Sequence, residues 1–232
     1  WDLESQLSGV PVWLRLARPQ RAALVTALTV GIDTPERMGA AAARIAGAGL
    51  IKIKVDADDP AARIDAVRRA APHDRLIVDP NESWSIELLR DMQQPLARAG
   101  VDLLEQPLPA DADDALLDFS GSIPICADEA CHETRDLPRM RGRYQAINIK
   151  LDKTGGLTEA WHLLRAARRE GFKVMVGCMV CSSLGIAPAL ELAREAAFVD
   201  LDGPFWLQHD HPDGVQLQGG SLLPPLSGFW GG

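Results

Sequence analysis

The feature that most constrains the fold is a regular alternation of two kinds of segment along all 232 residues. Short runs rich in β-branched residues alternate with longer stretches in which apolar residues recur with helical spacing. This alternation is typical of repeated strand–helix units around a parallel sheet. We predict eight strands, at residues 24–31, 50–55, 76–79, 101–105, 123–128, 146–150, 173–177 and 198–202.

The stretches between these strands predict amphipathic helices, at residues 35–48, 60–70, 85–99, 158–170 and 186–195. Two of them begin with proline, after Thr34 and after Asp59, at the first helical position, where the missing N–H costs nothing. Eight strands with helices between them favour a closed (β/α) barrel, and an open doubly wound sheet is the alternative. No G-x-G-x-x-G motif follows the first strand, so a dinucleotide-binding sheet loses its main support.

Composition and charge exclude several classes of function. Hydrophobic residues make up 47% of the chain and charged residues 24%, so we expect one globular domain over residues 1–232. The net charge of −8, without any run rich in Lys or Arg, argues against nucleic acid as a partner. We find neither a membrane-spanning apolar stretch nor a secretory signal, and predict a cytoplasmic protein with no membrane partner. The oligomeric state stays open, with a homo-oligomer among the alternatives.

Acidic residues stand at the ends of three consecutive predicted strands. Asp79 ends the third strand, Glu105 the fourth and Asp128 the fifth. In a barrel the C-terminal strand ends form one rim, so these carboxylates are expected side by side. One acidic residue at a strand end is usually a helix cap, but three adjacent carboxylates repel each other unless a hard cation holds them. The pattern therefore predicts an Mg²⁺ site.

Lysines are predicted on two opposite sides of the same rim. Lys52 and Lys54 are two residues apart on one strand and so share a face, while the apolar residues between them take the other face. Lys150 ends the sixth strand, four strands away in a ring of eight. An amine acts as a general base when its pKa is lowered, and we expect Mg²⁺ and a second lysine to lower it here. A base on each side of a bound carboxylate is the geometry of a racemase or epimerase.

Five motifs make the chain similar to the muconate-lactonizing subgroup of the enolase superfamily. I-K-I-K at residues 51–54 resembles the K-x-K base motif, and D-P-N-E-S-W at residues 79–84 resembles the D-x-N-x-x-W metal motif. E-Q-P at residues 105–107, A-D-E at residues 127–129 and N-I-K-L-D-K-T-G-G at residues 148–156 match the remaining ligand and base motifs. The resemblance implies a TIM-type (β/α)7β barrel that binds Mg²⁺. The N-terminal α+β capping domain of the family is not found in this sequence, so we expect it to be missing.

The resemblance also implies roles for individual residues. Lys54 is expected to be the base on one face of the substrate and Lys150 the base on the other, with Lys52 binding the substrate carboxylate. D-L-D at residues 200–202 resembles the D-x-D motif of dipeptide epimerases, in which two carboxylates receive the α-ammonium group of the substrate. Asp200 and Asp202 are therefore predicted to bind that group.

Further substrate contacts follow from the same resemblance at Thr29, Cys178 and Met179. Cys178 and Cys181 have C-x-x-C spacing, but reduced, buried cysteines are favoured over a zinc site. The two histidines of H-D-H at residues 209–211 lie in a loop rich in turn residues, where solvent exposure is favoured over metal binding.

Three functions are consistent with these residues. The first is Mg²⁺-dependent epimerisation of a dipeptide such as L-Ala-L-Glu by proton transfer between two lysines through an enediolate. The second is an N-acylamino acid racemase or an o-succinylbenzoate synthase, whose substrates carry no free ammonium group. The third is a non-catalytic metal-binding barrel fragment, which the buried lysines argue against.

Overall fold

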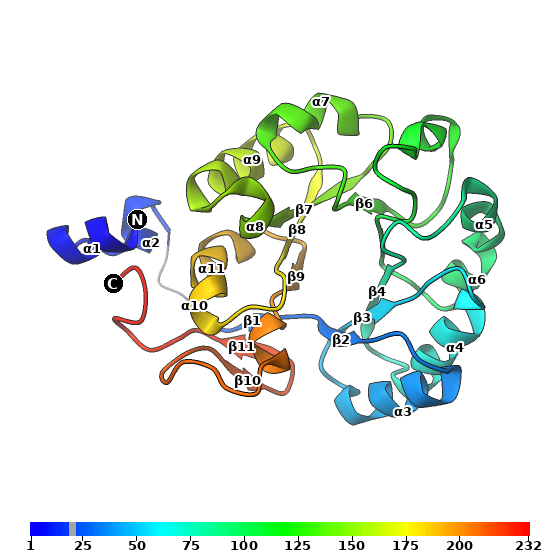
Figure 1. Cartoon of the computed structure of the whole chain (residues 1–232), viewed down its shortest axis with the longest axis horizontal. Coiled ribbons are helices and arrows are strands. Elements are labelled where there is room, and N and C mark those ends of the chain that lie inside the picture. Colours follow the sequence, from blue (N-terminus) through cyan, green and yellow to red (C-terminus); the bar gives the residue numbers. More distant parts are fainter. Residues whose placement is uncertain (19–21) are drawn as a thin grey trace.

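Eight parallel strands form a nearly closed barrel in the computed structural model, which describes residues 1–18 and 22–232 (Figure 1). Each barrel strand pairs with the next one along the chain, from β2 to β9. This order confirms the predicted barrel over the open sheet. The strands are β2 (Leu28–Val30), β3 (Leu50–Lys54), β4 (Arg75–Asp79), β5 (Leu103–Glu105), β6 (Ile125–Ala127), β7 (Ala146–Lys150), β8 (Lys173–Gly177) and β9 (Phe198–Asp200).

Hydrogen bonds between the first and last strand regions complete the ring. The N–H of Ala27, just before β2, donates to the carbonyl of Val199 in β9 at 2.7 Å. The N–H of Leu201 donates to Thr26 Oγ1 at 2.9 Å. The segment that follows β9 therefore lies beside β2 and β3 at the rim of the barrel.

The first predicted strand, at residues 24–31, is divided between two sheets. Its first part, β1 (Leu24–Val25), pairs with β11 (Ser221–Leu223), which also pairs with β10 (Gln216–Gln218) in an antiparallel sheet. The chain changes sheet at Thr26, because the N–H of Thr26 donates to the carbonyl of Gly220 and its side chain accepts from the β9 region. Strands β7 and β8 have the predicted bounds, and the other strands differ from the prediction by one or two residues at their ends.

Helices surround the barrel on its outside (Figure 1). Several begin at a side chain that caps a backbone N–H, as at Thr34, Asp59 and Ser85. The longer helices and those near the site are α3 (Pro35–Ile45), α4 (Pro60–Ala70), α5 (Ile86–Asp91), α6 (Gln93–Arg98), α7 (Leu137–Met140), α8 (Leu151–Thr154), α9 (Leu157–Arg169), α10 (Ser183–Ile186) and α11 (Leu190–Ala193).

Two predicted helices are interrupted. The helix expected at residues 85–99 is divided into α5 and α6, and Pro95 lies in the first turn of α6. Proline has no N–H to donate to the preceding turn, so it does not continue a helix that began upstream. Pro188 is the second residue of the 3-10 helix η3 (Ala187–Ala189), where the helix expected at residues 186–195 is irregular.

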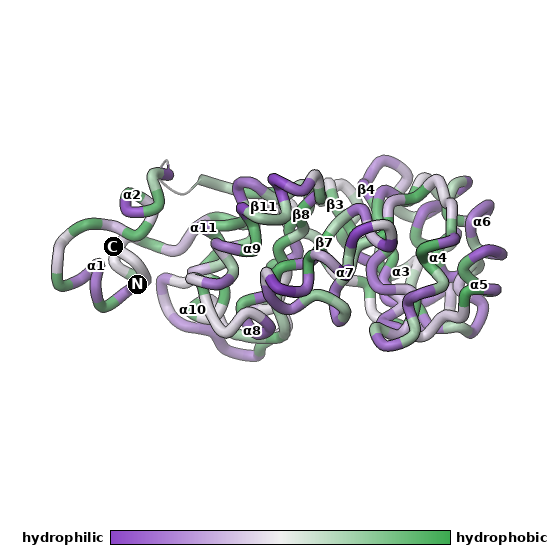
Figure 2. The backbone as a smooth tube through the Cα atoms, turned by 90° about the horizontal axis from the view of Figure 1, so that it is seen from above, coloured by the Kyte–Doolittle hydropathy of each residue, from purple (hydrophilic) through white to green (hydrophobic). Residues whose placement is uncertain are grey.

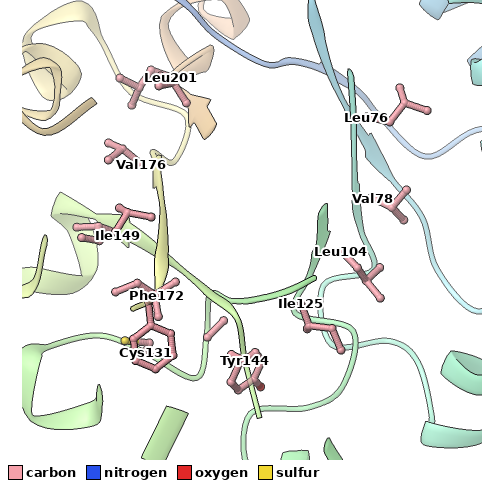
Figure 3. Packing of buried hydrophobic residues seen from close by; sticks show 14 of the residues in the cluster. Leu76, Val78, Leu104, Ile125, Cys131, Tyr144, Ile149, Phe172, Val176 and Leu201 are labelled. Atoms are coloured by element: carbon pink, nitrogen blue, oxygen red, sulfur yellow. The ribbon is translucent and has the colours of Figure 1, made fainter. Parts of the chain in front are cut away.

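Side chains of the strands alternate between the barrel interior and the helix layer. On β3, Ile51 and Ile53 are fully buried among the residues that pack against the helices, and Figure 3 shows Leu76, Val78 and Ile149 of other strands in the same cluster. Leu50 belongs instead to the interior layer. That layer takes one residue from each strand region: Ala27, Leu50, Ile77, Leu103, Cys126, Ala146, Met175 and Phe198.

The two chain ends meet outside the barrel. Helices α1 (Asp2–Ser8) and α2 (Val12–Arg15) lie at one end of the elongated molecule, next to the C-terminal segment (Figure 2). The N–H of Gly231 donates to Asp2 Oδ1 at 2.7 Å. Among the described residues, no helix combines the length and the apolar character that a membrane span requires.

Candidate active site

A cavity of about 240 Å³ opens at the C-terminal ends of the barrel strands. Its wall contains every lysine and every substrate-binding residue predicted from the sequence: Thr29, Lys52, Lys54, Lys150, Cys178, Met179, Asp200 and Asp202. The predicted metal ligands are buried next to it and contact its lysines: Asp79, Glu105 and Asp128. The structure therefore brings together the residues that the motifs singled out.

Lys52 lies at the centre of the buried carboxylates. Its Nζ is 2.9 Å from Asp79 Oδ2, 2.7 Å from Glu105 Oε2 and 2.9 Å from Asp200 Oδ2. Burial disfavours the charged amine, but the three carboxylates outweigh burial and raise the pKa of Lys52 well above its usual value. Although the residue is only 2% exposed, these carboxylates therefore favour the charged form of its amine.

Lys54 and Lys150 lie on β3 and β7, four strands apart around the barrel. Lys54 Nζ donates to Asp79 Oδ2 at 2.7 Å and to Asn81 Oδ1 at 2.6 Å. Lys150 Nζ donates to Asp128 Oδ2 at 2.6 Å and lies 3.9 Å from Met179 Sδ. Each amine is therefore held by a different carboxylate on its own side of the cavity.

The pKa of Lys150 is raised, not lowered as we expected for a base. Burial lowers this pKa, but Asp128 and then Glu105 raise it by a larger amount. The expected lowering depends on a bound Mg²⁺ as well as on a second lysine, and without the ion Asp128 and Glu105 outweigh the effect of Lys52. A lowered pKa therefore stays a prediction for the site with Mg²⁺ bound.

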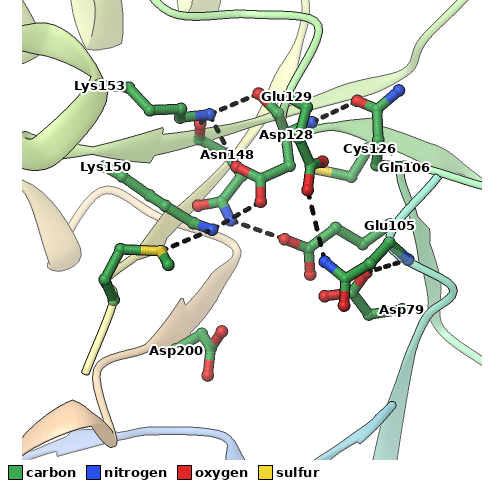
Figure 4. A network of polar contacts seen from close by, with 12 residues as sticks. Asp79, Glu105, Gln106, Cys126, Asp128, Glu129, Asn148, Lys150, Lys153 and Asp200 are labelled. Carbon is green, nitrogen blue, oxygen red and sulfur yellow. Dashed lines mark hydrogen bonds and ion pairs between the residues drawn. The ribbon is translucent and has the colours of Figure 1, made fainter. Parts of the chain in front are cut away.

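Glu105 is the carboxylate whose charge is least compensated. Burial, followed by repulsion from Asp79, raises its pKa to about 8, although Lys52 acts in the opposite direction. Asn148 Nδ2 donates to its Oε1 at 2.8 Å (Figure 4). Its Oε2 lies 2.7 Å from Lys52 Nζ and has no other polar partner. A buried carboxylate oxygen held by a single cation, among carboxylates that repel it, fits the donor set of a hard cation.

The same side chains are not arranged as a finished metal site. Within the described part of the chain, no three Asp, Glu, His or Cys side chains lie where they could jointly hold an ion. Lys52 stands between Asp79 and Glu105 and occupies the space between their oxygens. Cation binding therefore requires Lys52 to move away from these two carboxylates.

Asp200 and Asp202 lie on the side of the cavity formed by β9 and the following segment. Asp202 Oδ2 accepts from the backbone N–H of Thr29 at 2.9 Å, and the Thr29 side chain also favours the ionised form of this carboxylate. Burial, and then the nearby charge of Asp200, raise the pKa of Asp202. Asp200 Oδ1 is buried without a hydrogen-bond partner. The pair thus presents negative charge that a positively charged ligand can compensate.

The model for the enolase C-terminal domain-like family matches residues 37–226. The chain belongs to this family. It is 45% identical to N-acetyl-D-glutamate racemase from Pseudoalteromonas sp, over all of this chain and 73% of the relative. It is 46% identical to L-Ala-D/L-Glu epimerase from Escherichia coli (strain K12), over 96% of this chain and 70% of the relative. These enolase-family relatives are isomerases that act on amino acid derivatives, which confirms the predicted enzyme class.

Solved structures of the family agree with this relation. An enolase family member from Agrobacterium tumefaciens with homology to dipeptide epimerases, bound to sodium and L-Ala-L-Glu, is 45% identical and superimposes with a TM-score of 0.96. It covers all of this chain, and the match spans 71% of that protein. A dipeptide epimerase from Cytophaga hutchinsonii, complexed with Mg and D-Ala-L-Val, is 29% identical, with a TM-score of 0.89, over 97% of this chain and 65% of its own. The family thus includes dipeptide epimerases that hold Mg.

Sequence reasoning gave no role to several polar residues of this enolase-family site. Lys153 Nζ donates to Asp128 Oδ1 at 2.7 Å and to three backbone carbonyls (Figure 4). Gln106 Oε1 accepts from the N–H of Asp128 at 2.8 Å. Asn148 contacts Glu105. All three residues lie inside the motifs at residues 105–107 and 148–156. Their place in the sequence, next to the predicted ligands and bases, could have identified them as residues of the site.

The C-x-x-C pair is divided: Cys178 lines the cavity, whereas Cys181 does not. Of the remaining cysteines, Cys126 belongs to the barrel interior beside the site and Cys131 packs in the cluster outside the strands. His209 and His211 are exposed, and Asp210 between them accepts from the N–H of Ser183 at 2.9 Å. This carboxylate anchors the first turn of α10.

Proposed function

We propose that the protein catalyses Mg²⁺-dependent epimerisation of a dipeptide of the L-Ala-L-Glu type at its C-terminal residue. The observation that carries this proposal is the placement of Lys54 and Lys150 on opposite sides of one cavity, with Asp200 and Asp202 on a third side. Two amines on opposite faces of one carbon can exchange its proton with inversion, and the acidic pair gives the substrate ammonium a partner.

Asp79, Glu105 and Asp128 are the residues proposed to hold Mg²⁺. Their oxygen donors suit this ion, and Glu105, whose pKa is raised by burial and by Asp79, has an oxygen that only Lys52 contacts and that a cation would use. When bound, Mg²⁺ supplies positive charge beside the substrate carboxylate and so stabilises the negative charge that develops on loss of the α-proton. Lys52, displaced from Asp79 and Glu105, keeps Asp200 as a partner and is available to the substrate carboxylate.

The two bases act on opposite faces of the α-carbon. Lys54 removes the proton from one face, and Lys150 returns a proton to the other face. In the reverse direction Lys150 removes the proton and must be neutral, whereas Asp128 and Glu105 now favour its charged form. Ligation of a cation by these carboxylates would compensate their charge and so lower the pKa of the lysine towards the neutral range.

Asp200 and Asp202 are proposed to bind the α-ammonium group and so to select dipeptides with a free N-terminus. Asp202 is held by the backbone N–H of Thr29, and both carboxylates line the cavity. A charge-assisted hydrogen bond of this kind contributes about 1.5–3 kcal/mol, which corresponds to roughly 10- to 150-fold in affinity.

A second function is supported by one comparison. N-acetyl-D-glutamate racemase is as similar to this chain as the L-Ala-D/L-Glu epimerase is. An N-acetylated substrate has the same reacting carbon and carboxylate but no ammonium group, so it needs the lysines and not the acidic pair. Racemisation of N-acyl amino acids is therefore the alternative.

Proton NMR in D₂O separates these functions. The purified protein is incubated with Mg²⁺ and either L-Ala-L-Glu or N-acetyl-glutamate, with EDTA in place of Mg²⁺ as the control. We expect loss of the glutamate α-proton signal of the dipeptide and growth of the L-Ala-D-Glu signals, only with Mg²⁺. Exchange confined to N-acetyl-glutamate would favour the racemase, and no exchange of either substrate would refute both proposals.

An Asp202→Asn variant provides the sharper comparison, because it keeps the shape of the side chain and removes its charge. We expect dipeptide turnover (kcat/KM) to fall by roughly 10- to 100-fold while any N-acetyl-glutamate exchange stays unchanged. An equal loss for both substrates would contradict the ammonium-binding role.

A further inference from the structure

A buried hydrogen-bond chain leads from the outside of the barrel to the backbone of Asp128. It begins at Asp113 in the 3-10 helix η1 (Asp113–Asp118), whose side chain is fully buried. Asp113 Oδ1 is 2.7 Å from Arg139 Nη2 of α7, and a second arginine, Arg143, lies 3.4 Å from the same oxygen. The hydroxyl of Tyr144 donates to Asp113 Oδ2 at 2.7 Å.

Gln106 continues the chain to the metal-binding end of β6. Its Nε2 donates to the Tyr144 hydroxyl oxygen at 3.0 Å and to the carbonyl of Leu108 at 2.8 Å. Its Oε1 accepts from the N–H of Asp128 at 2.8 Å and from the N–H of Ala130 at 3.2 Å. The side-chain amide therefore uses both of its donors and both of its acceptor positions.

The charge of Asp113 fixes the direction of every bond in this chain. A carboxylate only accepts, so the Tyr144 hydroxyl must donate to Asp113 and presents its oxygen to Gln106. That oxygen needs a donor, which directs Nε2 of Gln106 towards Tyr144 and Oε1 towards Asp128. If the Gln106 amide were turned by 180°, its NH₂ group would face the backbone N–H groups of Asp128 and Ala130, so that donors would face donors. Gln106 also has a φ of +31°, a conformation that favours glycine, so its backbone is held by its surroundings.

We propose that Asp113 and Tyr144 are positioning residues that set the orientation of Gln106 and, through it, the backbone of Asp128. Neither residue lines the cavity, and neither touches the lysines of the site. Their effect is to hold Asp128 where its carboxylate meets Lys150 and Lys153. The expected effect of the Asp128 position on Mg²⁺ binding rests on the proposed function. The effect of Asp113 and Tyr144 on the backbone of Asp128 is independent of that function.

A Tyr144→Phe variant tests this proposal because it removes one oxygen and keeps the aromatic ring. In the protein without metal, we expect hydrogen exchange of the Asp128 and Ala130 amides to become about tenfold faster. We also expect the dissociation constant for Mg²⁺ to rise by about two- to tenfold, with kcat at saturating Mg²⁺ close to that of the unchanged protein. An Asp113→Asn variant, which keeps an acceptor for the hydroxyl, should shift both quantities in the same direction by a smaller factor.

Gln145 offers a matched control at the opposite end of β6. Its Oε1 accepts from the N–H of Ile125 at 2.9 Å, as Gln106 does from Asp128. A Gln145→Ala variant should accelerate exchange at Ile125 and leave exchange at Asp128 and the Mg²⁺ affinity unchanged.

The outcomes separate the two proposals. Unchanged exchange at Asp128 and Ala130 in both Tyr144→Phe and Asp113→Asn would overturn the positioning role. Faster exchange together with unchanged Mg²⁺ affinity would overturn its link to the metal. If the unchanged protein neither binds Mg²⁺ nor exchanges substrate protons, the proposed function fails, while the exchange data on Asp128 still decide whether the chain orders this segment.

Discussion

Affinity for Mg²⁺ should increase steeply with pH across the neutral range, because the pKa of Glu105 is raised to about 8 by burial and by Asp79. A carboxylate binds a cation only in its ionised form, so below pH 8 the ion must displace a proton from Glu105. Asp79 and Asp128 do not add to this effect, since their lysine partners outweigh burial and lower their pKa values. The competition therefore comes from one carboxylate, and it weakens as the pH rises.

The size of the effect follows from that single pKa. Protonation of Glu105 multiplies the apparent dissociation constant for Mg²⁺ by a factor of one plus the ratio of protonated to ionised Glu105. This factor is about 100 at pH 6, about 11 at pH 7 and about 2 at pH 8. Isothermal titration calorimetry in two buffers of different ionisation enthalpy measures both the affinity and the number of protons released. We expect Glu105 to release about one proton at pH 6 and almost none at pH 9, so that any proton released at pH 9 comes from a lysine whose pKa the bound ion lowers.

A Glu105→Gln variant is the control for this experiment. It removes the titrating group and one ligand, so Mg²⁺ binding should be weaker at every pH and should lose the increase in affinity that Glu105 causes between pH 6 and 8. An affinity of the unchanged protein that is constant over this range, with no proton released, would refute the assignment of Glu105 as the protonated ligand.

Two further substitutions test the packing around the site. Urea titration of a Lys153→Met variant should show a free energy of unfolding lowered by about 3–5 kcal/mol, because the buried carboxylate of Asp128 loses one of its cations. In the same titration, substitution of the exposed Lys173 by Met should change the free energy of unfolding by less than about 1 kcal/mol. A Gly203→Ala variant should have a free energy of unfolding lowered by about 1–3 kcal/mol, because the added Cβ would lie 2.5 Å from the carbonyl oxygen of Met179. The control is Gly31→Ala, whose added Cβ meets open space and should leave the free energy of unfolding unchanged. Equal effects in either pair of variants would contradict the reasoning.

The parts of the site that depend on local patterns could be predicted from the sequence. Alternation along β3 is enough to place Lys52 and Lys54 on the side opposite to Ile51 and Ile53. Parallel strand order is enough to gather the acidic strand ends at one rim, because all C-terminal ends of such a barrel meet there. Both conclusions need only the spacing of residues within a strand and the order of strands along the chain.

The parts that depend on distant contacts could not be predicted. Lys52 and Asp200 are 148 residues apart in the sequence, and their contact helps to make the lysine pKa rise rather than fall. The division of the first strand follows from the hydrogen bond between Thr26 and Leu201, which are 175 residues apart. Only the folded chain brings these partners together.

The buried acid of the hydrogen-bond chain shows the same limit within one short segment. Asp111, Asp113 and Asp114 lie in the sequence D-A-D-D, and nothing in its composition distinguishes the three. In the structure Asp113 is buried against two arginines and Tyr144, while Asp111 and Asp114 are exposed. The burial of Asp113 depends on the conformation of η1 and on its partners Arg139, Arg143 and Tyr144, which lie 26 or more positions later in the sequence.

Under the proposed function, one ion would bear on both catalytic lysines through the carboxylates that contact them. Lys54 Nζ donates to Asp79 and Lys150 Nζ donates to Asp128, and both carboxylates are among the residues proposed to hold Mg²⁺. A cation on Asp128 and Glu105 would offset the two charges that now raise the pKa of Lys150. Transfer of a proton across the α-carbon requires one neutral and one protonated amine, so this change in the pKa of Lys150 would bring the pair towards the state that the reaction uses.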